Sequence, residues 1–264
     1  MEMLQIALIQ ASILRKSPEA NQEALLAEAA RSAENGAKLV ILPELWNVSF
    51  PRGTGEIPPQ AEKTALSALC RTARRFGAGI VAGSMAVRSE NGMVNRCHVI
   101  GPDGKILLAY DKIHASPFDF GAGPFNPGST LGLFRLFGWK AGLLICFDME
   151  FPEQCRSLVE NGAELLIVVG AWPSDHVRIW RTMLAARAME NQVFAVGVNR
   201  CDSSPFVRFG GHSLVVDPFG ETLLQLDDRP RTEMAWLRKS LVERARRTHA
   251  VWSSRREELY RRWR

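Results

Sequence analysis

AGLLICFDMEFPEQ, residues 141–154, is the stretch that decides the fold. An aliphatic run ends at Cys146, and Pro152 suits the first turn of a helix that opens a few residues later. The stretch therefore predicts a buried strand, a sharp turn that carries a thiol, and a helix. Such a turn exposes a side chain and offers the backbone N–H of Phe147 to a developing negative charge. On this context alone, Cys146 is either a nucleophile or a small buried core residue.

Short apolar runs alternate with helix-period segments on both sides of this stretch, which predicts an α/β protein. The predicted strands are 4–10, 38–44, 78–87, 93–101, 105–112, 164–172, 193–200, 211–220 and 233–238, and the predicted helices cover about 17–35, 60–75, 152–161 and 176–191. Several strands are apolar on both faces, as expected where helices cover one face of a sheet and a second sheet covers the other. Two packed sheets flanked by helices satisfy this pattern, but the pattern does not fix the strand order.

Composition and organisation indicate one ordinary globular domain. The chain has 264 residues, of which 46% are apolar and 23% charged. No internal repeat or flexible linker divides it, so residues 1–264 are expected to form one domain with a basic tail from about 244 to 264. No apolar run approaches the ~20 residues of a membrane helix, and Gln5 and Gln10 interrupt the first apolar run where a signal peptide would be apolar. We therefore expect a cytoplasmic protein without a membrane partner.

The five cysteines contain no CxxC pair, so neither a disulfide framework nor a zinc site is expected. The net charge of +5 depends on arginines of the tail, namely Arg244, Arg246, Arg247, Arg255, Arg256, Arg261, Arg262 and Arg264. A nucleic-acid interface needs a basic face with stacking aromatic residues or a known module. We expect instead a tail that is solvated or contacts another subunit, and no nucleic-acid partner.

Two charged residues stand at the ends of apolar strands. Glu44 follows Val-Ile-Leu-Pro, and Lys112 follows Leu-Leu-Ala-Tyr-Asp. Taken singly, the acid could cap a helix or pair with an arginine, and the lysine could extend into solvent. Together with Cys146 they supply what acyl transfer requires, namely a nucleophile, a proton acceptor and a cation for the tetrahedral oxyanion.

Three segments resemble the signature segments of the nitrilase superfamily, in the same order: LPELW (42–46), YDKIH (110–114) and ICFDMEFPE (145–153). The segments 170–173, 180–200, 211–221 and 255–260 are similar to its omega-amidase-like branch. The resemblance implies a four-layer α-β-β-α sandwich, assembled as a homodimer or higher oligomer through the surface that bears the helix after Cys146. It also implies a small-molecule amide substrate and neither a cofactor nor a metal.

By this resemblance Glu44 accepts the thiol proton, Cys146 attacks the carboxamide carbon, and Lys112 with the Phe147 N–H holds the oxyanion. Ammonia leaves, and water then hydrolyses the thioester. The alternatives within the superfamily are hydrolysis of a carbamoyl amide or a nitrile. Outside it, a binding protein that retains only the fold is possible, or a Cys-His protease with one of His98, His114, His176, His212 and His249 beside Cys146.

One departure from the family pattern concerns a second glutamate, which the family places before a Phe-x-Pro-Gly turn. That turn is present at residues 125–128, but the matching position is Gly121. Asp119 is the nearest acid, and either it reaches in from a shifted loop or the role is vacant. Phe151 and Trp172 are further candidates for the substrate pocket, and His114 is expected to be a structural hydrogen bonder.

Overall fold

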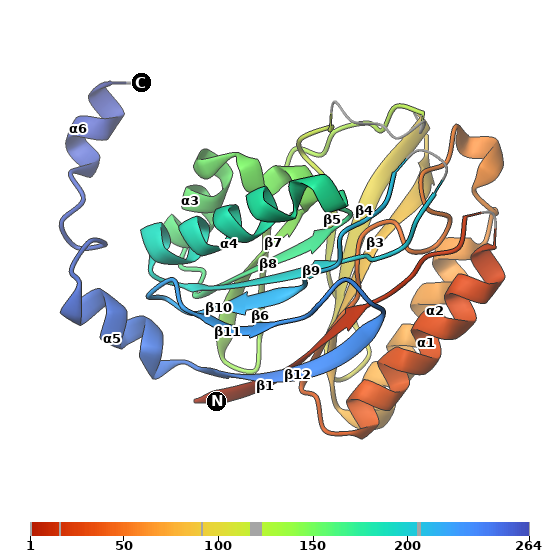
Figure 1. Ribbon diagram of the computed structural model, residues 1–264, viewed down its shortest axis with the longest axis horizontal. Helices are drawn as coiled ribbons and strands as arrows, with labels where there is room; N and C mark the ends of the chain where they lie inside the picture. Colours follow the sequence, from red (N-terminus) through yellow and green to blue (C-terminus); the bar gives the residue numbers. More distant parts are fainter. Residues whose placement is uncertain (1, 16, 91, 117–122, 205–206, 264) are drawn as a thin grey trace.

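The computed structural model describes residues 2–15, 17–90, 92–116, 123–204 and 207–263. Two six-stranded sheets pack face to face (Figure 1). The first runs in the order β12-β1-β2-β3-β4-β5 and the second in the order β11-β10-β9-β8-β7-β6. The strands of the first sheet are β1 (Met3–Gln10), β2 (Leu39–Ile41), β3 (Gly79–Ser89), β4 (Gly92–Ile100), β5 (Ile106–Asp111) and β12 (Arg231–Arg238). Those of the second are β6 (Gly132–Leu136), β7 (Trp139–Ile145), β8 (Leu165–Gly170), β9 (Phe194–Asn199), β10 (Leu214–Val216) and β11 (Thr222–Gln225).

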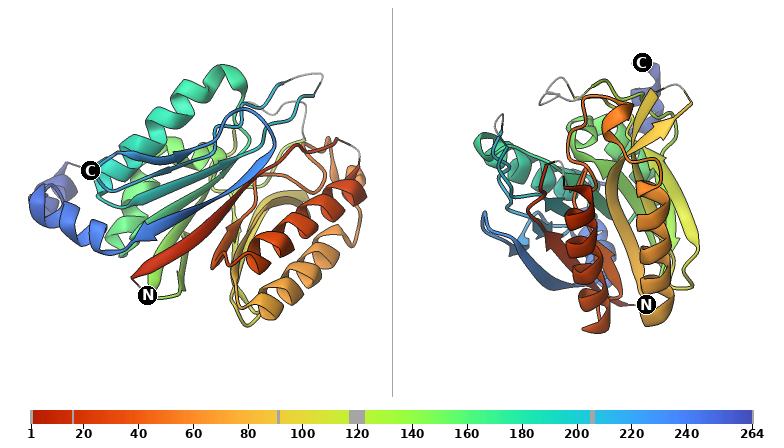
Figure 2. Two further views of the ribbon diagram at one scale, coloured as in Figure 1. Left: turned by 60° about the horizontal axis from the view of Figure 1, so that its bottom comes forward. Right: turned by 90° about the vertical axis from the view of Figure 1, so that its right-hand side faces the viewer.

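Helices cover the outer face of each sheet (Figure 2). The helices α1 (Pro18–Glu34) and α2 (Ala61–Phe76) cover the first sheet, and α3 (Pro152–Glu160) and α4 (Val177–Asn191) cover the second. Two further helices, α5 (Ser240–Thr248) and α6 (Glu257–Arg262), follow the last strand. The expected four-layer α-β-β-α sandwich is confirmed.

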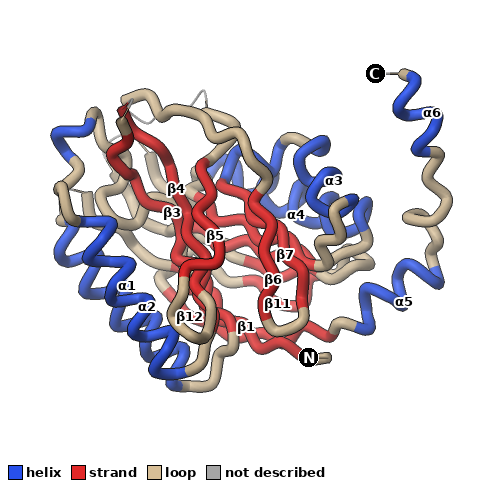
Figure 3. Tube along the Cα trace, turned by 180° about the vertical axis from the view of Figure 1, so that it is seen from behind, coloured by secondary structure: helices blue, strands red, loops and turns tan. Residues whose placement is uncertain are grey.

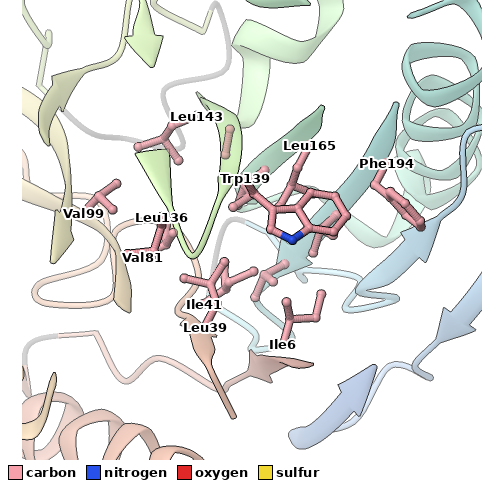
Figure 4. Packing of buried hydrophobic residues seen from close by; sticks show 14 of the residues in the cluster. Ile6, Leu39, Ile41, Val81, Val99, Leu136, Trp139, Leu143, Leu165 and Phe194 are labelled. Carbon is pink, nitrogen blue, oxygen red and sulfur yellow. The ribbon is translucent and has the colours of Figure 1, made fainter. Parts of the chain in front are cut away.

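The strand β8 shows why some runs are apolar on both faces. Leu165, Ile167 and Val169 point into the core between the two sheets, whereas Leu166 and Val168 pack under α3 and α4. Each fully buried side chain of this size contributes about 1.5–3 kcal/mol by leaving water. Figure 4 shows the central core, where Trp139 meets Phe194 edge to face with ring centroids 5.8 Å apart.

Four helices were predicted from the sequence, and each lies within two residues of its expected bounds. The strands β6 and β11 were not predicted. Both are sheet edges, and β11 is largely exposed, so it lacks the apolar pattern of a buried strand. The basic tail contains the second half of α5 and all of α6, and neither helix was predicted. Among the described residues, no helix combines the length and apolar character needed to cross a membrane.

Parallel pairing in both sheets brings three chain segments to one region. The strands β1, β2 and β3 run parallel, as do β7, β8 and β9. Glu44 follows β2, and its backbone N–H donates to the Gly170 carbonyl at the end of β8, 3.5 Å away. Because Cys146 follows the neighbouring strand β7, the strand ends of the two sheets meet around these residues.

Candidate active site

The thiol of Cys146 lies on a strained turn between β7 and a short 3₁₀-helix, η2 (Cys146–Glu150). Cys146 has a φ of 50°, in the left-handed region that non-glycine residues rarely adopt. Such strain is retained where the surrounding structure fixes it, often at functional sites. Phe147 stands in the first turn of η2, where backbone N–H groups have no partner within the helix.

Glu44 and Lys112 form a buried ion pair beside this turn. The Lys112 Nζ lies 3.0 Å from Glu44 Oε1, and the two residues are 9% and 1% exposed. The same oxygen accepts a hydrogen bond from Asn95 Nδ2 on β4, at 2.8 Å. The other oxygen, Glu44 Oε2, is buried without a hydrogen-bond partner among the described residues. One carboxylate oxygen is therefore fixed by two donors, and the second remains available to a thiol, a substrate or water.

The three side chains act on each other electrostatically. Burial raises the pKa of the Cys146 thiol, the charge of Glu44 raises it further, and Lys112 partly offsets both. Burial disfavours the charged form of Lys112, but the charges of Glu44 and Asp148 raise its pKa above the ordinary value. Lys112 is therefore a permanent cation at neutral pH, while Cys146 is a protonated thiol. A thiol in this state needs a base to become a nucleophile.

Asp148 joins the strand that precedes Lys112 to the turn that carries Cys146. Its Oδ2 accepts hydrogen bonds from the Tyr110 hydroxyl at 2.7 Å and from the Ile145 backbone N–H at 3.0 Å. Its Oδ1 accepts one from the His114 backbone N–H at 2.9 Å and lies 3.0 Å from His114 Nδ1. Because Tyr110 and His114 flank Lys112, this fully buried carboxylate fixes the lysine and the thiol relative to each other. His114 is thus the structural hydrogen bonder that was expected.

A small cavity of about 30 Å³ adjoins the thiol. Trp172 lines it, together with Ser116, Phe147 and His176. Asn199 fixes the Trp172 backbone, since its Oδ1 accepts from the Trp172 N–H at 2.7 Å. Phe151 is not among the described residues that line this cavity. Its ring stacks on His114 with centroids 3.6 Å apart.

Two residues that the sequence analysis considered for the site lie outside the described part of the chain. Asp119 and Gly121 fall within 117–122, outside the described residues. Of the five histidines, His176 lines the cavity, but the charges that act on the Cys146 thiol are those of Glu44 and Lys112. Within the described ranges, no group of three or more His, Cys, Asp or Glu residues is placed to hold a metal ion.

Several residues of the site were not predicted from the sequence. The sequence around Asn95 predicts a strand but gives Asn95 no role in the site. Asp148 lies inside the signature segment 145–153, but the sequence does not indicate its role. Glu150 lines the cavity and is exposed. A polar residue within an apolar strand, as at Asn95, was the available signal, because buried polar groups require partners.

The chain belongs to the carbon-nitrogen hydrolase family, whose model matches residues 5–247. The expected membership of the nitrilase superfamily, near the omega-amidase branch, is confirmed, and so is the expectation of an enzyme that hydrolyses carbon–nitrogen bonds. A 2-oxoglutaramate amidase of Bacillus subtilis is 36% identical over 190 residues, which cover 72% of this chain and 73% of that protein. The omega-amidase NIT2 of Danio rerio is 30% identical and covers 87% of this chain and 86% of its own.

Solved structures of an amidase from Nesterenkonia are similar over the whole fold. One has a TM-score of 0.84 and 28% sequence identity, covering 99% of this chain and 96% of its own. A mutant of that amidase, with the same TM-score and identity, covers 99% of this chain and 97% of its own. That mutant shows covalent addition of the acetamide moiety of fluoroacetamide at its active-site cysteine.

Proposed function

We propose that this protein hydrolyses a small carboxamide to the acid and ammonia through a thioester on Cys146. The observation that carries the proposal is the buried Glu44–Lys112 pair beside a strained cysteine turn. Glu44 Oε2 accepts the thiol proton as the sulfur attacks the carbonyl carbon. Lys112 and the Phe147 N–H stabilise the oxyanion, and Glu44 returns the proton to the departing ammonia.

Water then completes the reaction. Glu44 takes a proton from a water molecule, which attacks the thioester carbon, and the thiol leaves with that proton. The small cavity favours a compact acyl group. Two relatives, named 2-oxoglutaramate amidase and omega-amidase, support a small carboxamide as the class of substrate.

Trapping of the acyl-enzyme tests this proposal. In wild type, a rapid acid quench during turnover of a small amide should capture an acyl group on the thiol. In Glu44→Gln the side-chain shape is kept but the base is lost, so the same quench should capture none. Intact mass measurement after acid quench, followed by peptide mapping, should locate the added acyl mass on Cys146. Ammonia release by wild type without any acyl adduct on Cys146 after the quench would contradict the thioester route.

We also propose that the protein is a homodimer or higher oligomer in which the basic tail contacts the partner subunit. Trp252 docks the middle of the tail, with the Arg156 guanidinium of α3 5.5 Å from its ring centroid. Beyond it the chain leaves the body and carries α6 outward (Figure 1, Figure 3). Trp263 is 74% exposed there, and a hollow of about 730 Å³ separates the tail from α3. A second copy would cover these groups.

We place the protein in the cytoplasm. Its five cysteines are free, which fits a compartment that keeps thiols reduced. The proposed chemistry also depends on a reduced Cys146.

A further inference from the structure

Among the described residues, one carboxylate lines the cavity beside the Cys146 thiol. It belongs to Glu150, the last residue of η2, which lines the cavity with Cys146, Trp172 and His176. Glu150 is exposed, so its carboxylate is accessible to a molecule that enters the cavity. No role in acyl transfer falls to this residue, since Glu44 and Lys112 supply the base and the cation.

This carboxylate has no neutralising partner among the residues that the structure describes. Its side chain forms no ion pair or hydrogen bond with any of the described residues. Arg187 forms a hydrogen bond with Glu150, but its Nη2 donates to the backbone carbonyl, at 3.2 Å, and not to the side-chain carboxylate. The charge of Arg187 is instead matched by Glu190, 2.9 Å from Nη1.

Permanent cations are also missing from the described lining of the cavity. Neither lysine nor arginine is found among the described residues that line it. The segments 117–122 and 205–206, whose structure is not described, contain no lysine or arginine in the sequence. At the thiol itself, Lys112 is matched by Glu44. An acyl group that carries its own carboxylate would therefore meet Glu150 without a compensating charge.

We propose that Glu150 is a specificity residue that makes this site select neutral or cationic small amides and reject amides whose acyl part is an anion. The inference rests on the proposed function and narrows its substrate class. It separates this chain from the Bacillus subtilis relative, because 2-oxoglutaramate, for which that relative is named, bears a carboxylate.

Alkylation of Cys146 measures this selection without turnover. Iodoacetamide and iodoacetate have the same reactive carbon and nearly the same size, but only the second is an anion. The measured quantity is the ratio of the iodoacetamide rate to the iodoacetate rate at Cys146, divided by the same ratio for a free thiol. In wild type this normalised ratio should be about ten or more, which corresponds to ~1.4 kcal/mol of repulsion of the anion. Peptide mass spectrometry assigns the rate to Cys146.

Two variants separate Glu150 from a general charge effect. Glu150→Gln should bring the normalised ratio close to one, and the wild-type preference should shrink with added salt because the group is exposed. Glu153→Gln removes the same charge from α3, at a residue that does not line the cavity, and should leave the ratio unchanged. A wild-type ratio near one, or equal effects of the two variants, would overturn the inference.

Hydrolysis of two matched amides distinguishes the inference from the function on which it rests. Succinamide and succinamate have the same carbon chain, and only succinamate carries a negative charge. A kcat/KM for succinamate equal to or above that for succinamide would refute the charge selection while leaving the thioester chemistry in place. Ammonia release from neither amide nor from other small amides, with the alkylation ratio still dependent on Glu150, would refute the proposed function and uphold the selection.

Discussion

The ammonium group of Lys112 is the most constrained cation in the site. It is buried, paired with Glu44 at 3.0 Å, and close enough to Asp148 for that charge to raise its pKa as well. A donor fixed in this way needs little reorganisation when negative charge develops on a substrate oxygen. Losing one oxyanion donor typically costs about 2.7–4 kcal/mol of barrier.

Lys112→Ala should therefore lower kcat at least about a hundredfold in steady-state assays of ammonia release. Lys105→Ala, which removes an exposed lysine from the turn before β5, is the matched control and should retain wild-type turnover. Near-normal turnover of a folded Lys112→Ala protein would remove the lysine from the mechanism.

At the residue scale, sequence reasoning identified the groups whose chemistry is unusual for their position. Glu44, Lys112 and Cys146 stand at the ends of apolar strands, and the structure brings them together. Asn95 and Asp148 could not be assigned in the same way, because their roles depend on which strands meet across the sheet. Hydrogen bonds from β4 to Glu44 and from β5 to η2 arise only after folding.

At the scale of secondary-structure elements, the strand β4 carries a buried histidine, His98, away from the active site. Burial, then Arg96, lowers the pKa of His98 to about 4, although Glu62 of α2 lies 3.4 Å away and Asp111 acts in the opposite direction. The folded protein thus keeps His98 neutral at a pH where the unfolded chain binds a proton. The contribution of this neutral histidine to the stability of the fold is fully present above about pH 6.5. It is lost as the pH falls toward 4, because the unfolded chain then binds a proton that the folded chain does not.

When the pH falls from 7 to 5.5, the unfolding free energy of wild type should decrease by about 1 kcal/mol more than that of His98→Gln. Urea denaturation of both proteins at the two pH values measures the difference. The raised pKa of Glu62 acts with the opposite sign, at lower pH. Identical pH dependence in the two proteins would show that His98 is not held neutral.

The elements themselves were largely predictable where periodicity is strong. The helices α2 and α3 follow from their apolar spacing, and the strands β1 and β8 follow from their short apolar runs. The edge strands β6 and β11 were missed because an edge position allows exposed and polar residues. Strand order was not predictable, since it depends on crossover connections rather than on any local pattern.

For the whole molecule, the tail is the part least accounted for by the fold of a single chain. Its α6 makes little contact with the body. The rings of Tyr260 and Trp263 contact each other at a tilt of 47°, with centroids 5.8 Å apart, and both residues remain exposed. Exposed aromatic residues on an extended arm are typical of a subunit contact.

Removal of residues 256–264 should weaken self-association by at least tenfold, measured by sedimentation velocity over a range of concentrations. The truncation ends after Arg255, so the ion pair between Arg255 and Glu160 on α3 is retained, as is the docking of Trp252. An intact chain that is monomeric at micromolar concentration, or a truncated chain with unchanged association, would contradict this role of the tail.

The central claim is that the thiol of Cys146 performs amide hydrolysis, and ammonia release by wild type and Cys146→Ser tests it most directly. The panel should contain neutral small amides, a keto-acid omega-amide, a carbamoyl amino acid and a simple nitrile, with Cys70→Ala as a matched control for loss of a cysteine. We predict release from a small amide by wild type and Cys70→Ala, and none by Cys146→Ser. Release that persists in folded Cys146→Ser, or that is absent from wild type with every compound, would contradict the account.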